Sequence, residues 1–111
     1  MKYLCLVHLD EKSPDPVSDR DCNAYTEALR KSGHYIAAEA LQPVHTATTV
    51  RVRNGKVSMT DGPFAETKEQ LAGFYLIDAR DLDEALFLAS KIPPARAGSV
   101  EVRPVRELSA K

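Results

Sequence analysis

The 111-residue chain has no tryptophan, only two cysteines and three phenylalanines, and its formal net charge is -1. Cys5 and Cys22 lack metal-ligand spacing and are too few for a disulfide framework, so we expect no metal site and a reducing, cytoplasmic location. The 15 basic and 16 acidic residues nearly cancel. Without a broad field of one sign, we expect neither direct nucleic-acid binding nor attachment to a membrane.

Cofactor-binding motifs are also missing. The sequence has no glycine loop that would cradle a phosphate, no Gly-x-Ser-x-Gly turn and no local Cys/His nucleophile pair. We therefore expect no cofactor, so any chemistry has to come from carboxylates and imidazoles. The length suits one domain with one modest core, and no linker or repeat divides residues 1–111.

The first residues carry a charge and then an apolar run, as a signal peptide would. Acidic residues follow directly and the run is too short to span a bilayer, so we predict a strand over residues 2–9. Both alternating faces of this strand are apolar, with Cys5 and Val7 on one and Leu4 and Leu6 on the other. Helices of the same chain can cover only one face, so the other needs a lid, a ligand or a second subunit.

Helical spacing and capping residues predict a helix over residues 16–32. It starts at Asp15-Pro16 or at Ser18, and Gly33 is placed to end it in a left-handed conformation. The spacing of residues 67–70 predicts a short capped helical turn.

A second helix is predicted after Asp81, which forms a capping-box pattern with Glu84. The pair Pro93-Pro94 stops this helix. Its core-facing apolar stripe is predicted to consist of Leu82, Ala85, Leu86, Ala89 and Ile92.

Strand patterns cover residues 35–41, 47–53, 56–60, 73–79 and 99–106. The Asn54-Gly55 pair between two of them supplies the positive φ angles of a type I′ turn and predicts a hairpin. Pro104 lacks an N–H, which places it on a sheet edge or at a strand end.

The resulting order predicts an α+β fold with a split βαβ pattern. Its antiparallel sheet carries two helices on one face, and the hairpin is an insertion. We expect the uncovered face of the sheet to be buried by an identical chain, giving a two-fold homodimer with a cavity between the sheets.

The turn at residues 60–64 brings a carboxylate and a phenyl ring together beside the sheet. Asp61 either fixes the turn by accepting backbone N–H bonds or serves as a catalytic or ligand-binding carboxylate. Phe64 is either a core plug or a platform for a substrate.

Three histidines offer a general base, but none has metal-ligand spacing. His8 either faces the cavity between the sheets and titrates near neutrality, or is a hydrogen-bonded histidine at the end of a strand. His34 beside a helix C-terminus either complements the helix dipole or acts in a site, and His45 lies in a loop.

Further ligand-binding candidates lie on the predicted strands. Arg51 with Thr49 would hold a carboxylate or phosphate if both point into the cavity, or Arg51 pairs with Glu39, Glu66 or Glu101. Glu39 is itself a candidate ligand contact, and Tyr75 would form a wall of the cavity with Phe64.

The Asp-Gly-Pro-Phe motif at residues 61–64, with Glu66, Lys68 and Glu69, closely resembles the motif of the DGPF branch of the YCII-related family. The resemblance extends along the chain, through residues 39–43, 47–51, 73–77, 81–85 and 98–104.

This resemblance implies a ferredoxin-like domain of the dimeric α/β-barrel type over residues 1–111. It also implies an enzyme that uses a His and an Asp, with lyase-type chemistry in some relatives. Asp61 matches the family Asp position, whereas His8, His34 and His45 all stay open for the histidine. Because the DGPF branch is known beside sigma-factor domains, the alternative is a non-enzymatic regulatory partner of a sigma factor. We expect a small-molecule ligand that is anionic or aromatic and, for the enzyme, a proton-abstracting lyase or isomerase.

Overall fold

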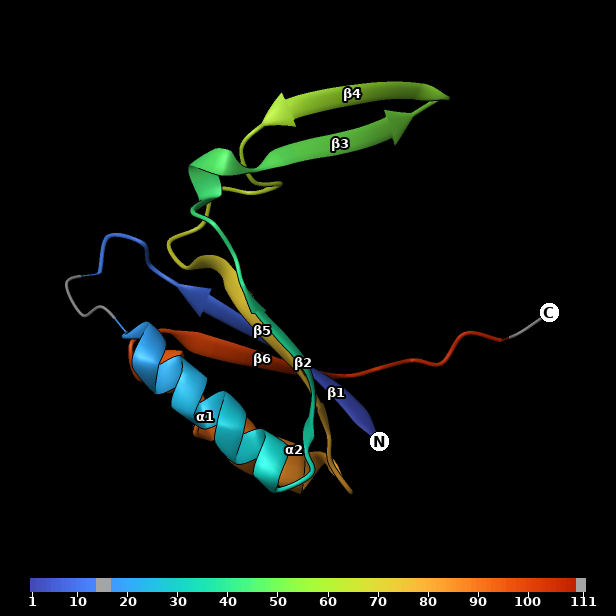
Figure 1. The fold of residues 1–111 in the computed structure, drawn as a ribbon. Coiled ribbons are helices and arrows are strands. Elements are labelled where there is room, and N and C mark those ends of the chain that lie inside the picture. The colour runs from blue at the N-terminus through green and yellow to red at the C-terminus, as the bar shows by residue number, and fades with distance from the viewer. Residues whose placement is uncertain (14–16, 110–111) are drawn as a thin grey trace.

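The computed structural model describes residues 1–13 and 17–109. A four-stranded antiparallel sheet forms its centre, in the order β2-β5-β1-β6 (Figure 1). These strands are β1 (Lys2–Leu9), β2 (Tyr35–Ala40), β5 (Gln70–Asp78) and β6 (Ser99–Pro104). The other elements are α1 (Asp19–Lys31), α2 (Leu82–Ser90), the 3-10 helices η1 (Val44–Thr46) and η2 (Pro93–Arg96), and the hairpin strands β3 (Thr48–Arg53) and β4 (Lys56–Asp61).

Both helices lie on one face of the sheet, as predicted (Figure 1). The helix side buries alternate residues of the two central strands, Tyr3, Cys5 and Val7 from β1 and Tyr75 and Ile77 from β5. Because antiparallel neighbours share a face, this period of two defines one core layer. The architecture is therefore α+β, consistent with a ferredoxin-like fold.

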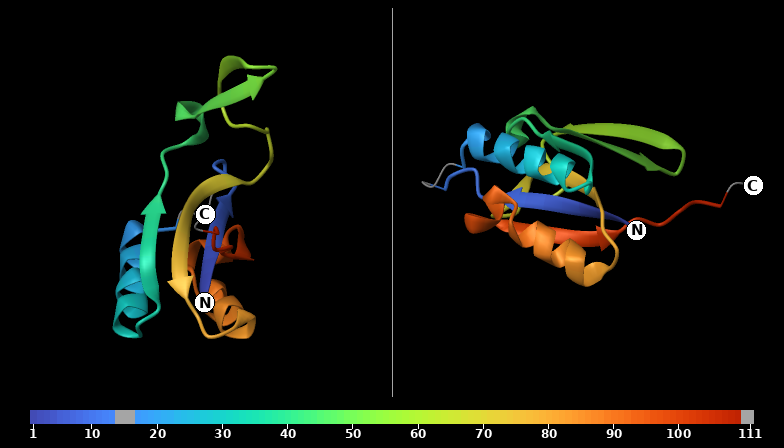
Figure 2. Two further views of the ribbon diagram at one scale, coloured as in Figure 1. Left: turned by 90° about the vertical axis from the view of Figure 1, so that its right-hand side faces the viewer. Right: turned by 60° about the horizontal axis from the view of Figure 1, so that its bottom comes forward.

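We call the opposite side of the sheet the open face. It carries Leu4 and Leu6 of β1 opposite Leu76 and Phe74 of β5. All four side chains are half-buried. No helix of the described chain covers them, and Figure 2 (left) shows the strands in front of the helices from this side.

The predicted helix caps are confirmed. The Ser18 hydroxyl accepts a hydrogen bond from the Asp21 N–H at 3.1 Å, and the Asp81 carboxylate accepts one from the Glu84 N–H at 2.9 Å. Gly33 follows α1 with φ +81°, the left-handed conformation that glycine adopts without strain. The alternative start at Asp15-Pro16 lies outside the described residues.

Two local predictions are wrong. Residues 67–70 form no helical turn, because the Thr67 hydroxyl donates to the Glu69 carbonyl and Gln70 already pairs with Leu9 as the first residue of β5. On α2, Leu82 and Leu86 are each 47% exposed. The small Ala85 and Ala89, with Ile92, bring α2 close to the sheet and turn the two leucines outward.

The predicted hairpin is confirmed, with φ 53° at Asn54 and 75° at Gly55. Residues 48–61, which we call the arm, extend away from the sheet on the side opposite the helices (Figures 1 and 2). The radius of gyration is 15.9 Å. A compact domain of this length would have about 13 Å, so the arm makes the protomer unusually extended.

Candidate functional site

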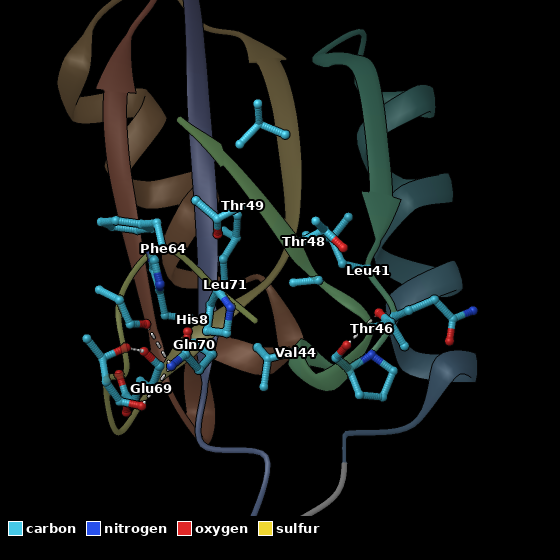
Figure 3. A pocket seen from close by; sticks show the side chains of 17 residues that line it. His8, Leu41, Val44, Thr46, Thr48, Thr49, Phe64, Glu69, Gln70 and Leu71 are labelled. Carbon is cyan, nitrogen blue, oxygen red and sulfur yellow. Dashed lines mark hydrogen bonds between the residues drawn. The ribbon is translucent and has the colours of Figure 1, made fainter. Parts of the chain in front are cut away.

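A cavity of about 790 Å³ lies where the arm joins the sheet (Figure 3). His8 of β1 and Leu71 of β5 form its base, and Phe64 comes from the turn after β4. Most of the lining is apolar. The remaining lining residues are Leu41, Gln42, Pro43, Val44, Thr46, Ala47, Thr48, Thr49, Val50, Pro63, Ala65, Thr67, Glu69 and Gln70.

A β-bulge places His8 in this cavity. The register between β1 and β5 shifts between Val7, which pairs with Gly73, and His8, which pairs with Leu71, so Ala72 is the extra residue. Such bulges re-aim side chains at the ends of sheets. His8 and Leu71 consequently lie side by side at the cavity base.

Gly98 fixes the backbone at His8 from the other side. A Cβ at Gly98 would collide with the His8 carbonyl oxygen and would lie 2.8 Å from a methyl carbon of Leu9. Glycine is therefore required by the close approach of the loop before β6, and not by a special φ angle.

Most polar groups of the cavity are already used to hold the loops. The Gln70 side-chain amide donates to the carbonyls of Ala65 and Thr67, at 3.2 and 3.0 Å. The Thr49 hydroxyl donates to the Gly62 carbonyl at 2.8 Å. Their donors are satisfied within the protein, which leaves the His8 imidazole as a prominent polar group for a ligand.

Glu101 of β6 lies beside His8, with 4.0 Å between His8 Nε2 and Glu101 Oε1. This is longer than a hydrogen bond and fits a pairing through water or with the protonated imidazole. Arg103 holds the other carboxylate oxygen of Glu101, at 2.8 Å from Nε and 2.6 Å from Nη2. Arg103 therefore fixes the Glu101 carboxylate beside His8 and offsets part of its negative charge.

The structure brings together three of the residues proposed from the sequence, because His8, Thr49 and Phe64 all line the cavity. Phe64 is 82% exposed, so within one protomer it is not a core plug. Asp61 is exposed at the end of β4, opposite Thr48, and is not among the cavity-lining residues.

Arg51, Tyr75 and Glu39 lie elsewhere. The Arg51 guanidinium donates to the Phe64 carbonyl at 3.3 Å, and Arg51 is not among the cavity-lining residues. Tyr75 packs edge-on against Tyr25 under α1, where burial raises the pKa of its hydroxyl. Tyr75 lines a separate groove of about 540 Å³ between α1 and the sheet. Glu39 of the edge strand β2 borders this groove, although its pairing with Phe74 places its side chain on the open face.

The other two histidines are outside both hollows. His34 accepts or donates a hydrogen bond with the Ser32 hydroxyl at 2.7 Å and faces Glu84 at 3.3 Å. The Ser32 hydroxyl also donates to the Leu29 carbonyl at 3.1 Å. The contact between His34 and Glu84 therefore links the end of α1 to the start of α2. His45 is exposed in η1.

Sequence reasoning missed the relation between Glu101 and His8. Nothing in the sequence pattern connected the two residues. The pairing of His8 with Ser99 and of Leu6 with Glu101 places the carboxylate beside the imidazole, and this register comes from tertiary structure.

Among residues 1–13 and 17–109, no cluster of three His, Cys, Asp or Glu side chains could hold a metal ion. Within the same part of the chain, no helix is long and apolar enough to cross a membrane.

The α+β fold with its split βαβ sheet and arm defines the class of the domain. The family model of the YCII-related domain matches residues 1–109 of the sequence. An uncharacterized protein of Rhizobium meliloti (strain 1021) is 41% identical over 114 residues, which cover 95% of this chain and 92% of that protein. The chain therefore belongs to the YCII-related family.

Proposed function

We propose that the protein binds a small, largely apolar or aromatic molecule in the cavity at the base of the arm. The observation that carries this proposal is the position of His8 among apolar side chains in a hollow of about 790 Å³. This volume is in the range of small-molecule sites, which are mostly apolar with a few polar groups. Since Arg51 lies outside the lining, the support favours an aromatic ligand over an anionic one.

For the catalytic version of this function, His8 is the general base. Imidazole is the most common general base in enzymes, and the Glu101 carboxylate beside it would orient the ring. Abstraction of an acidic C–H proton by His8 is the first step of a cofactor-independent lyase or isomerase. Asp61 remains a candidate for a second catalytic group beside His8, provided that dimer formation brings its carboxylate to a cavity.

A second copy of the chain on the open face is part of the proposal. One cross-strand row places Leu6 and Phe74 between Glu39 and Glu101, an apolar centre with charged edges. Two such faces would bury their centres against each other and give the barrel-like dimer that the family resemblance implies. The free thiols Cys5 and Cys22 are compatible with a reducing cytoplasm.

Binding can be tested with 4-nitrophenol, a small aromatic probe with an ionisable hydroxyl. Equilibrium dialysis should show binding to the wild-type protein that weakens at least tenfold in His8→Asn, because the variant removes the imidazole from the cavity base. His45→Asn is the matched control on an exposed histidine and should bind as the wild type does. Equal binding by all three proteins would remove His8 from the ligand site.

A non-enzymatic regulatory role is the second candidate. Leu82, Leu86 and Phe87 of α2 are 47%, 47% and 63% exposed, and together they present an apolar surface away from the sheet. Such a surface suits a helical partner, and the family resemblance suggests a sigma factor. Co-purification of a sigma factor that is lost in Leu86→Lys and kept in Asp83→Lys would support this role, whereas no co-purification would count against it.

A further inference from the structure

The arm has one apolar and one polar face. Its register pairs Val50 with Met59 and Val52 with Val57, which puts all four on one face. Their exposed fractions are 57%, 72%, 57% and 61%. Four neighbouring apolar side chains that are more than half exposed form an unusual surface for an isolated soluble chain.

The arm also lacks support within the protomer. Beyond the contacts between β3 and β4, neither strand packs extensively on another helix or strand of the described chain. A two-stranded hairpin alone in water is at best marginally stable. A surface that binds this face would therefore stabilise the arm as well as bury the valines and the methionine.

We propose that the apolar face of the arm binds a second copy of this chain, so that each protomer clasps its partner. The arm and the open face form two sides of an angle, with the arm at the end of β1 and β5 (Figures 1 and 2). A second copy seated against the open face would lie within reach of this arm. By two-fold symmetry its own arm would reach the first copy.

The apolar character of the open face supports a second copy as the occupant. Leu4 and Leu6 of β1 and Phe74 and Leu76 of β5 are half-buried there and would meet the apolar face of the arm. The basic residues Arg51, Arg53 and Lys56 lie on the other face of the arm, so the contact would be apolar and would leave these charges in solvent.

The clasp would also complete the cavity. Thr48 and Val50 belong both to the cavity lining and to the face of the arm that would meet the partner. A partner on this face would cover the adjoining opening and exclude water from His8. This consequence rests on the proposed ligand-binding function, whereas the clasp itself does not.

Three substitutions on the apolar face, Val52→Thr, Val57→Thr and Met59→Thr, test the proposal. Threonine favours strands, so the combined variant keeps the backbone preference and removes apolar surface. Ser58→Thr, on the polar face, is the matched control. Sedimentation equilibrium should give a dimer for the wild type and the control, and a self-dissociation constant at least tenfold higher for the triple variant. Circular dichroism confirms that each protein is folded.

The possible failures are distinguishable. A triple variant that dimerises as tightly as the wild type overturns the clasp and leaves the open-face dimer standing. A wild-type protein that stays monomeric at 100 µM overturns both modes of association. Binding of 4-nitrophenol by that monomer would still uphold the ligand site, since dialysis measures the cavity independently of association.

Discussion

His8 and Leu71 lie opposite each other directly beyond the register shift between β1 and β5. The shift brings an imidazole and an apolar side chain to the base of the same cavity. The position of the His8 backbone also depends on the loop before β6, where Gly98 contacts it. A substitution at Gly98, outside the cavity, should therefore affect His8.

Replacing Gly98 with alanine should destabilise the protein. The new Cβ would collide with the His8 carbonyl, a backbone atom that cannot swing away, and overpacking of this kind costs about 1–3 kcal/mol. Urea denaturation measures the loss, and the His8 ring signals in NMR should move more than those of His45. Unchanged stability with unchanged His8 signals would contradict the close approach.

Stability should fall at alkaline pH because of a core thiol. Burial raises the pKa of Cys5 from 9.0 to about 11. The unfolded chain then loses this proton before the folded one, so the contribution is complete below pH 9.0 and is lost as the pH rises through about 11. Two pKa units correspond to roughly 2–3 kcal/mol.

The measurement is the slope of unfolding free energy against pH between 9 and 11. Cys5→Ala should be less stable at neutral pH but show a shallower slope than the wild type. Cys22→Ala is the comparison: burial also raises the pKa of this half-buried thiol, so the slope should change in the same direction but less than in Cys5→Ala. Equal slopes for the wild type and Cys5→Ala would refute the assignment.

Phe64 should matter for binding but little for stability. Its ring is 82% exposed and lines the cavity, so Phe64→Ala should change unfolding free energy by less than about 0.5 kcal/mol while weakening the binding of 4-nitrophenol. Tyr75→Phe removes only a hydroxyl on the helix side and should leave binding intact. A large loss of stability in Phe64→Ala would identify the ring as a structural plug.

Gly55 should affect self-association more than overall stability. At φ +75° an alanine is strained by about 1 kcal/mol, and the strain falls on the arm alone. Gly55→Ala should therefore keep the thermal midpoint nearly unchanged and weaken dimerisation. A midpoint lowered by many degrees without any change in association would show that the arm folds with the core.

The sequence was sufficient for the elements whose signals are local. Ser18, Asp81 and the Asn54-Gly55 pair predicted two helix starts and the hairpin through their own hydrogen bonds and φ angles. Alternation in β1 separated the helix side from the open face.

Features that depend on distant contacts were not predictable in this way. In the bulge, Gly73 and Leu71 pair with Val7 and His8 of β1 while Ala72 between them has no partner on β1, and nothing local marks this irregularity. The outward position of Leu82 and Leu86 results from the close packing of Ala85 and Ala89 on the sheet. The relation of Glu101 to His8 likewise depends on the register between β6 and β1.

The central claim is that the cavity at the base of the arm is a ligand site centred on His8. The most direct test is an NMR titration with 4-nitrophenol that follows the ring signals of the three histidines. Signals of His8 should shift in a saturable manner, while those of His34 and His45, which lie outside the cavity, should stay in place. Saturable shifts at His34 or His45 with no change at His8 would contradict the account.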